Sequence, residues 1–304
     1  MHEKRTGLEI LIEFGFSYTS QLGLYALLGL SLAIVFGVSR VPNLAVGDFA
    51  ALGAYGMVIL NFLPFWLRIA AILLVLAPMF YFIERWILSR VKDLLAGLLV
   101  TFGLGLAIRQ LMESIFTSTA LSVSTPVQGS TTVLGVTYPS YRIAIMAISF
   151  TVVAIALVIA YRTKVGLSLR AVSDNPPMSA LLGVRPAQTR GIAFVVASLI
   201  AVLAGALYSP LLGVSPSMGF SLLIPGFVAL LLVRPGSLRG AVAAVAFIVL
   251  FQVFLHRLLS APIADSIFYV VVLFTVVLLS NQRVRNMTST FPRPLRKTPQ
   301  RNLV

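Results

Sequence analysis

Residues 142–161 read RIAIMAISFTVVAIALVIAY, and a polar stretch, RTKVGLSLRAVSDNPPMSALLGVRPAQTR, follows at 162–190. The first stretch is long enough to cross a bilayer, because a helix needs about 20 apolar residues to span a hydrocarbon core roughly 30 Å thick. A helix also satisfies its own backbone hydrogen bonds in lipid. Apolar runs of this kind recur along the chain. The sequence therefore predicts an all-α, polytopic membrane protein.

The composition supports lipid as the solvent. Hydrophobic residues make up 59% of the chain and charged residues 11%, whereas soluble domains have about 45–50% apolar and about 25% charged residues. The absence of cysteine excludes disulfides and thiolate sites. The net charge of +14 fits basic loops that contact anionic lipid headgroups. We therefore expect membrane lipid, and not nucleic acid, as the partner of these charges.

The number of apolar runs predicts about 8–9 transmembrane helices. The candidate spans are 20–39, 44–63, 66–83, 94–113, 142–161, 191–213, 219–233, 240–258 and 266–282. The run 219–233 is short and contains Pro225-Gly226, which predicts a broken or half-crossing helix. We assign 1–282 to one integral membrane domain and 283–304 to a basic cytoplasmic tail.

Lysine and arginine predict the orientation, because they collect in cytoplasmic loops. They are present in 84–93, in 162–190 and in the tail, and absent from 114–141. The first three segments are predicted to be cytoplasmic and the last to be external. Three spans before 84–93 then place the N-terminus outside, which we favour although Lys4 and Arg5 argue against it. The alternatives are an extra crossing within 8–39 or a re-entrant segment at 44–63.

Few residues could carry chemistry. The chain has nine acidic residues and two histidines, without a clustered metal-ligand motif or a G-x-x-x-x-G-K-[ST] phosphate loop. We therefore expect neither catalytic residues nor a metal or cofactor, and any ATP hydrolysis belongs to a partner. Asp48 either complements the N-terminal end of a helix that begins near Asn43 or lies at a transport path. Arg109 and Glu113 are one helical turn apart and are predicted to pair.

The polar stretch 162–190 contains signals for a short helix. Asn175-Pro176-Pro177 blocks helix continuation and can begin a new helix, since proline fits a first turn. Residues 178–182, MSALL, then form a short apolar face, and Gly183 is placed to end it. Such a helix could dock in a groove of a soluble partner. A solvated interfacial loop is the other interpretation.

Three patches carry a family resemblance. The first has Gly166, Arg170, Ala171, Asp174, Asn175, Ala180, Gly183 and Val184, followed by Ala193-Phe194 and LAGAL at 203–207. The second is NLAVGDFAALGAY at 43–55, and the third is GSLRGA at 236–241. In this order the patches resemble the permease subunits of branched-chain amino acid ABC importers. The chain departs from the family pattern at Val233-Arg234-Pro235, where glycines are usual.

The resemblance implies an ABC importer permease-like bundle in a bacterial or archaeal cytoplasmic (inner) membrane, not an enzyme. Its substrate would be a branched-chain or other hydrophobic amino acid. It implies two cytoplasmic ABC ATPase subunits, a second permease subunit in a heterodimer, and a periplasmic or extracellular substrate-binding protein. The residues of the coupling loop would be Gly166, Arg170, Ala171, Asp174, Asn175, Ala180, Leu181 and Gly183. The residues of a translocation path would be Asn43, Gly47, Asp48, Gly53, Tyr55, Gly236, Ser237 and Gly240.

Two other classes of function are weighed against this one. An ion-coupled secondary transporter of a small solute is the alternative, but it would need a chain of buried acids that the spans lack. A membrane enzyme acting on lipid would need a catalytic constellation, and no such arrangement is visible.

Overall fold

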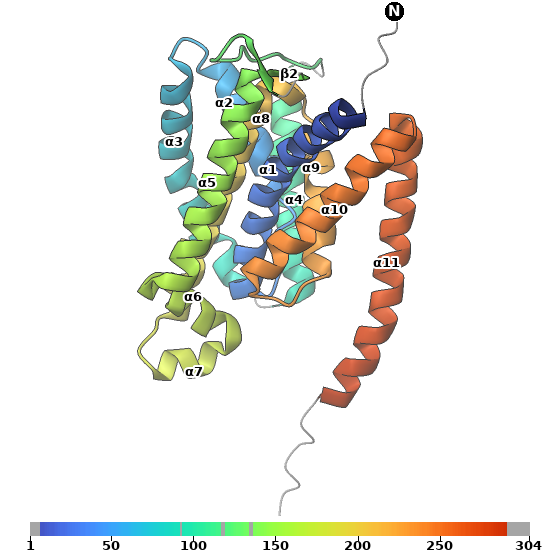
Figure 1. Cartoon of the computed structure of the whole chain (residues 1–304). Helices are drawn as coiled ribbons and strands as arrows, with labels where there is room; N and C mark the ends of the chain where they lie inside the picture. The colour runs from blue at the N-terminus through green and yellow to red at the C-terminus, as the bar shows by residue number, and fades with distance from the viewer. Residues whose placement is uncertain (1–6, 92, 117–118, 134–135, 291–304) are drawn as a thin grey trace, which may run out of the picture. The chain divides into compact units, whose positions relative to one another are not determined.

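The structure is a computed structural model that describes residues 7–91, 93–116, 119–133 and 136–290. It divides into two units, Met1–Val253 and Phe254–Val304, which are described separately. The elements (Figure 1) are α1 Gly7–Ser39, α2 Val46–Ile59, α3 Phe65–Trp86, η1 Leu88–Arg90, α4 Leu94–Ile115, β1 Ser130–Val133, β2 Val136–Pro139, α5 Ser140–Arg162, α6 Lys164–Asp174, α7 Pro176–Leu181, α8 Pro186–Leu212, α9 Met218–Leu231, α10 Leu238–Leu258 and α11 Ala261–Thr290.

The predicted all-α membrane class is confirmed. Within the described residues, six helices are long and apolar enough to span a membrane, and three shorter apolar helices accompany them. The shorter ones, 46–59, 218–231 and 261–275, coincide with three of the predicted spans. The expectation that 219–233 is short is also correct, but the helix is not broken, because α9 continues without interruption through Pro225.

Two boundaries differ most from the sequence-based prediction. The first helix begins at Gly7 and not near residue 20, because Glu9 and Glu13 interrupt the apolar pattern without interrupting the helix. The last helix continues past residue 282 to Thr290. Residues 291–304 of the predicted tail lie outside the described residues. In the second unit, His256 Nε2 lies 2.8 Å from Asp265 Oδ1 and joins the end of α10 to α11.

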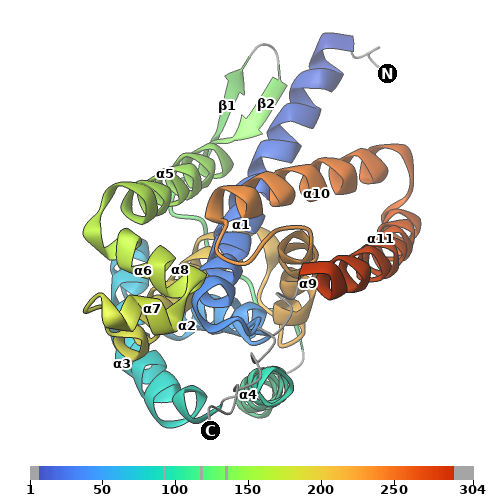
Figure 2. The ribbon, with the colours of Figure 1, turned by 90° about the horizontal axis from the view of Figure 1, so that it is seen from below.

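The first unit is built around α1 and α8. Their most apolar 18-residue windows are 78% and 72% buried, against 17% for α3, 17% for α4 and 22% for α5. Figure 2 shows the three less buried helices at the periphery of this unit. Large apolar side chains on them, such as Leu74 and Leu95, are 77% and 69% exposed. In a membrane protein these faces contact lipid, which is as apolar as leucine.

Glycines allow the central helices to approach closely. A Cβ atom added at Gly205 of α8 would overlap the carbonyl oxygen of Ala50 in α2, and one added at Gly53 of α2 would overlap that of Val202. Likewise, a Cβ atom at Gly47 would overlap the carbonyl oxygen of Gly219 in α9. Small residues at helix contacts are typical of membrane bundles, since backbone contact replaces the hydrophobic effect there. These positions set how α2 crosses α8 and meets α9.

The two ends of α1 can be identified by their contacts. Near its start, the Phe16 ring stacks on Tyr138 of β2 with 4.5 Å between centroids, and the Tyr138 hydroxyl donates to the Phe16 carbonyl at 3.3 Å. Just past its last residue, Arg40 donates to the carbonyl of Ser173 in α6. The start of α1 therefore lies at the hairpin end of this unit, opposite α6. This agrees with the favoured external N-terminus, provided that 114–141 is external as predicted.

Two elements are not anticipated from the sequence. The segment 114–141, read as an uncharged loop, contains an antiparallel hairpin in which Ser130 pairs with Pro139 and Thr132 with Thr137. The segment 162–190, read as a loop with one short helix, contains a second helix, α6. Neither element changes the helical class, because the hairpin has only two short strands.

Candidate coupling loop and translocation site

The segment α6–α7 begins with a conventional helix start. Thr163 lies just before α6, and its hydroxyl accepts a hydrogen bond from the amide of Gly166 at 3.2 Å. This is the side-chain capping that threonine provides at a helix N-terminus. A Cβ atom at Gly166 would overlap the carbonyl oxygens of Ile159 and Ala160 at the end of α5. Glycine therefore allows α6 to fold back tightly against α5.

The second helix of this segment, α7, forms as predicted. Asn175 is the N-cap of α7, and its Oδ1 accepts from the amide of Met178 at 3.1 Å. Pro176 occupies the first turn. Gly183 has a φ of +84°, and the amide of Val184 donates to the carbonyl of Ser179 at 3.0 Å. A left-handed residue that closes the last turn is the usual glycine helix stop.

The short helix presents apolar side chains to its surroundings. Met178, Leu181 and Leu182 are 53%, 83% and 76% exposed, and Ala180 is exposed beside them. Ser179 is the buried residue of α7. The helix therefore packs through this polar residue and leaves its apolar side chains exposed. An exposed apolar face on a polar loop is typical of a surface that binds another protein.

The end of α6 is anchored to the rest of the first unit. Ser173, one residue before the end of α6, is 1% exposed. It receives the hydrogen bond from Arg40, and a Cβ atom at Gly236 would overlap its hydroxyl oxygen. Gly236 has a φ of +88° and lies against Gly37 of α1. The end of α6 is therefore in direct contact with α1 and with the α9–α10 turn.

One predicted loop residue, Arg170, takes part in this anchoring. The guanidinium of Arg170 lies 5.2 Å from the ring centroid of Tyr161, and the guanidinium of Arg239 lies 4.1 Å from the same centroid. Cation–π contacts of this kind hold α5, α6 and α10 together. Asp174 is the last residue of α6, directly before the Asn175 cap. The structure thus places the predicted coupling-loop residues within one continuous segment.

The predicted path residues fall into two groups. Asn43, Gly47, Asp48, Gly53 and Tyr55 lie on α2 and the turn before it, and all are buried. Gly236 and Ser237 lie in the α9–α10 turn and Gly240 in the first turn of α10, where its amide donates to the Ser237 hydroxyl at 3.2 Å. The group around Gly236 contacts α6 and the end of α1. The group on α2 has different neighbours.

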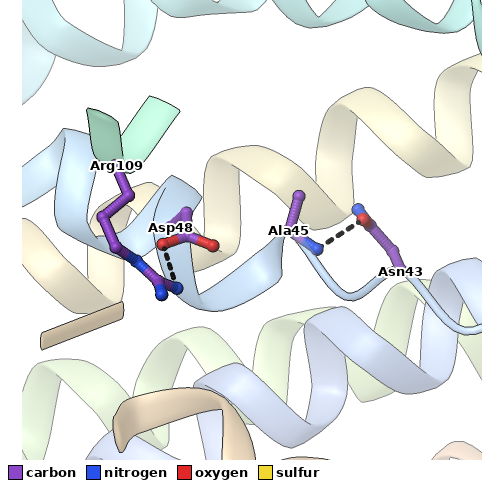
Figure 3. Close-up of polar contacts among 4 residues, drawn as sticks. All are labelled: Asn43, Ala45, Asp48 and Arg109. Carbon is purple, nitrogen blue, oxygen red and sulfur yellow. Dashed lines mark hydrogen bonds and ion pairs between the residues drawn. The ribbon is translucent and has the colours of Figure 1, made fainter. Parts of the chain in front are cut away.

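Asp48 is the main polar group of the first set. It is 4% exposed, and its Oδ1 lies 3.1 Å from Nη2 of Arg109 in α4 (Figure 3). The Arg109 guanidinium also lies 5.5 Å from the ring centroid of Phe220 in α9. We call this set the α2–α4–α9 junction: Asp48, Gly105, Arg109, Gly219 and Phe220. Gly105 and Gly219 belong to it because a Cβ atom at either would overlap or crowd the Asp48 carboxylate.

The junction corrects one prediction and refines another. Arg109 was expected to pair with Glu113, but the ion pair that the structure shows for Arg109 is with Asp48. Sequence spacing favoured the neighbour one turn away, whereas the close approach of α2 and α4 brings a carboxylate from 61 positions earlier. Asp48 also lies in the first turn of α2, so its predicted complementarity with a helix N-terminus is met as well.

The remaining residues near α2 have packing contacts. Asn43 Oδ1 accepts from the amide of Ala45 at 3.1 Å, which orders the turn before α2 (Figure 3). The Tyr55 ring packs on Phe116 with 4.8 Å between centroids. In the part of the chain that the structure describes, no group of three or more His, Asp or Glu residues could hold a metal ion.

These features define a class of protein: a polytopic helical membrane protein with a polar loop that carries a protruding apolar helix. The family described as "branched-chain amino acid transport system / permease component" matches residues 15–278. The chain therefore belongs to this family of ABC importer permeases. It is a multi-pass protein of the inner membrane and a transport subunit, and ATP hydrolysis takes place in separate subunits.

Similar proteins agree with this assignment. The chain is 25% identical over 236 residues to the high-affinity branched-chain amino acid transport system permease protein BraD of Pseudomonas aeruginosa, covering 71% of this chain and 77% of that protein. It is 21% identical over 277 residues to the permease protein LivH of Salmonella typhimurium, covering 84% and 89%. LivH of Escherichia coli (strain K12) gives the same identity and coverage. The family assignment favours an ABC permease over an ion-coupled carrier.

Proposed function

We propose that this chain conducts branched-chain or other hydrophobic amino acids across the inner membrane. Two cytoplasmic ATPases would drive it through α7, a second and different permease subunit would complete the path, and an external binding protein would deliver the substrate. The family match over 15–278 carries the transport class. The names of the similar proteins support the substrate class.

The exposed face of α7 supports its role as the coupling helix. Its apolar residues protrude where a soluble ATPase could receive them in a groove. The anchoring of Ser173 to α1 and to the α9–α10 turn then offers a mechanical route from α7 into the bundle. Closure of the ATPases on ATP would move α7 and shift the permease between its two access states. A translocation role for Asn43, Asp48 and Ser237 stays a prediction.

A charge placed on the α7 face tests this proposal. Leu181→Asp or Ala180→Asp in the assembled importer is expected to abolish leucine uptake and ATPase stimulation by the binding protein, because a carboxylate cannot enter an apolar groove without a partner. Membrane insertion should be unaffected. Leu181→Met is the matched control and should transport normally, since it conserves size and polarity. Full uptake by both aspartate variants would refute the assignment of α7 as the coupling helix.

A further inference from the structure

A cavity of about 340 Å³ lies in the first unit between α1, α3, α4 and α8. Its lining includes Val35, Val38, Asn43, Glu84, Arg190 and Phe194. The volume falls at the small end of the range for small-molecule sites, about 300–1,000 Å³. We call it the α3–α8 cavity. None of the path or coupling residues discussed above lines it, except Asn43.

The position of the cavity along the bundle follows from its walls. It is bordered by the last turns of α1 and by η1, which follows α3. The end of α1 is the end that contacts α6 through Arg40. The cavity therefore lies in the half of the unit nearer to α6 and α7, which is the predicted cytoplasmic half.

Glu84 requires an explanation. It is 8% exposed and lies in the last turn of α3, where a buried ionisable side chain is costly unless it is paired. Its carboxylate lies against Gly191, where an added Cβ atom would be 3.1 Å from Oε2. The positive charges that act on it are those of Arg190 and Arg85. An acid from α3 thus faces a base from α8 across one cavity.

Two donors near the cavity also lack acceptors. Asn43 Nδ2 and Arg190 Nε are buried and have no hydrogen-bond partner within the described residues. The orientation of the Asn43 amide is set by its Oδ1, which accepts from Ala45. Both atoms are enclosed by protein, so a ligand in the cavity would reach them only after the two side chains rotate.

The cavity also has apolar walls. Val35, Val38 and Phe194 provide an apolar surface beside the acid, the base and the amide. A ligand that fits all of these carries a cation for Glu84, a carboxylate for Arg190 and Asn43, and an aliphatic side chain for the valines. A free amino acid with an apolar side chain has these three parts. A simple cation would make no use of Arg190, and an apolar molecule would make no use of either charged group.

We propose that the α3–α8 cavity is a binding site for a zwitterionic amino acid with an apolar side chain, reached from the α6–α7 side of the membrane. Glu84 contacts its ammonium group, and Arg190 with Asn43 contacts its carboxylate. This proposal rests on the proposed function, because it assigns the transported class of molecule to a second site within one subunit. Occupancy from the product side would make the importer sensitive to the internal amino acid concentration.

The test uses the complete importer in nanodiscs without its external binding protein. Tritiated leucine is expected to bind, and Glu84→Gln or Arg190→Gln should weaken that binding about 10- to 100-fold, the loss of one hydrogen bond to a charged group. Leucinamide and 4-methylpentanoate, which each lack one ligand charge, should compete poorly. Glu113→Gln, an exposed acid of α4, should bind like the wild type. Val38→Phe fills the cavity without removing a charge and should also abolish binding.

The outcomes separate the two proposals. Wild-type binding in Glu84→Gln, Arg190→Gln and Val38→Phe, or equal competition by the two analogues, would overturn the cavity site. So would the absence of leucine binding by the wild type. Uptake that depends on the binding protein is measured in parallel with the same preparations. If the wild type takes up no branched-chain amino acid, the proposed function fails, whereas normal uptake with no effect of the cavity variants removes only the second site.

Discussion

The Asp48–Arg109 pair offers the sharpest test of how the helices are held together. Arg109→Met removes the cation and keeps most of the side-chain length. Asp48 would then remain buried without its counter-ion, because only 6% of its side chain is exposed. Water cannot take the place of the guanidinium there. Gly105 and Gly219 crowd the carboxylate from α4 and α9, so it cannot move outward without separating the helices.

The expected loss of unfolding free energy in Arg109→Met follows from the burial of Asp48. Removing one partner of a buried ion pair typically costs about 3–5 kcal/mol. Arg109 is 24% exposed on its side chain, so part of its charge is already solvated, and we expect the lower end, about 3 kcal/mol. That corresponds to a decrease of roughly 100-fold in the folding equilibrium constant. Asp48→Asn should cost less, since Arg109 can still contact solvent and the Phe220 ring.

Equilibrium unfolding in mixed micelles measures the effect. Trp66 and Trp86 both lie in α3 and are 50% and 59% exposed, so the loss of helix followed by far-UV circular dichroism is the measured signal. The double variant Asp48→Asn with Arg109→Met should recover most of the stability lost in Arg109→Met, because no charge is left buried. Glu113→Gln on the same helix is the control and should change the unfolding free energy by less than about 0.5 kcal/mol.

Additive stability losses in the two single variants and the double variant would refute this reasoning. If the double variant loses the sum of the two single losses within about 0.5 kcal/mol, the groups are not coupled. Unchanged stability of Arg109→Met would show that Asp48 is solvated or paired elsewhere in the membrane.

Two further predictions concern packing and the tail. Gly205→Ala should destabilise the protein by about 1–3 kcal/mol or more, because its Cβ would overlap the backbone of Ala50. Thermal unfolding measures this loss. Gly103→Ala is the control and should be neutral, because a Cβ atom there meets no atom within 4 Å. Deletion of 287–304 should leave uptake largely intact in vesicles, since a basic tail contributes mainly contact with anionic lipid, about 1 kcal/mol per cation. A severe loss of uptake would instead indicate a role of the tail in assembly or regulation.

Much of the fold could be predicted because the apolar runs carry one strong signal. A helix in lipid requires a long apolar segment, so spans such as 94–113 and 142–161 were located to within two residues of the observed helices. The start of α1 was missed because its first two turns contain acids, and a hydropathy pattern does not register a helix that begins in a polar region. α6 was missed because its length and composition are those of a loop, although the Thr163 cap was a usable signal.

The candidate site was predictable where the signal was local. Asn175, Pro176 and Gly183 act within one turn of their own sequence, and the structure bears out the cap, the first-turn proline and the left-handed stop. The Arg109 partner was not predictable in this way, because Asp48 is 61 positions away. No motif links Glu84 to Arg190 either, and only the packing of α3 against α8 brings them to one cavity.

The sequence by itself determined that this protein is a helical permease of the inner membrane, that its loops alternate in charge, and that a short helix opens at Pro176. Those properties depend on hydropathy and local backbone preferences, which act between residues close in the chain. Only the tertiary structure decided which helices are central, which glycines touch a foreign backbone and which charges meet in the interior. Such contacts depend on how whole helices cross, and a crossing is set jointly by side chains on both partners, far apart in sequence.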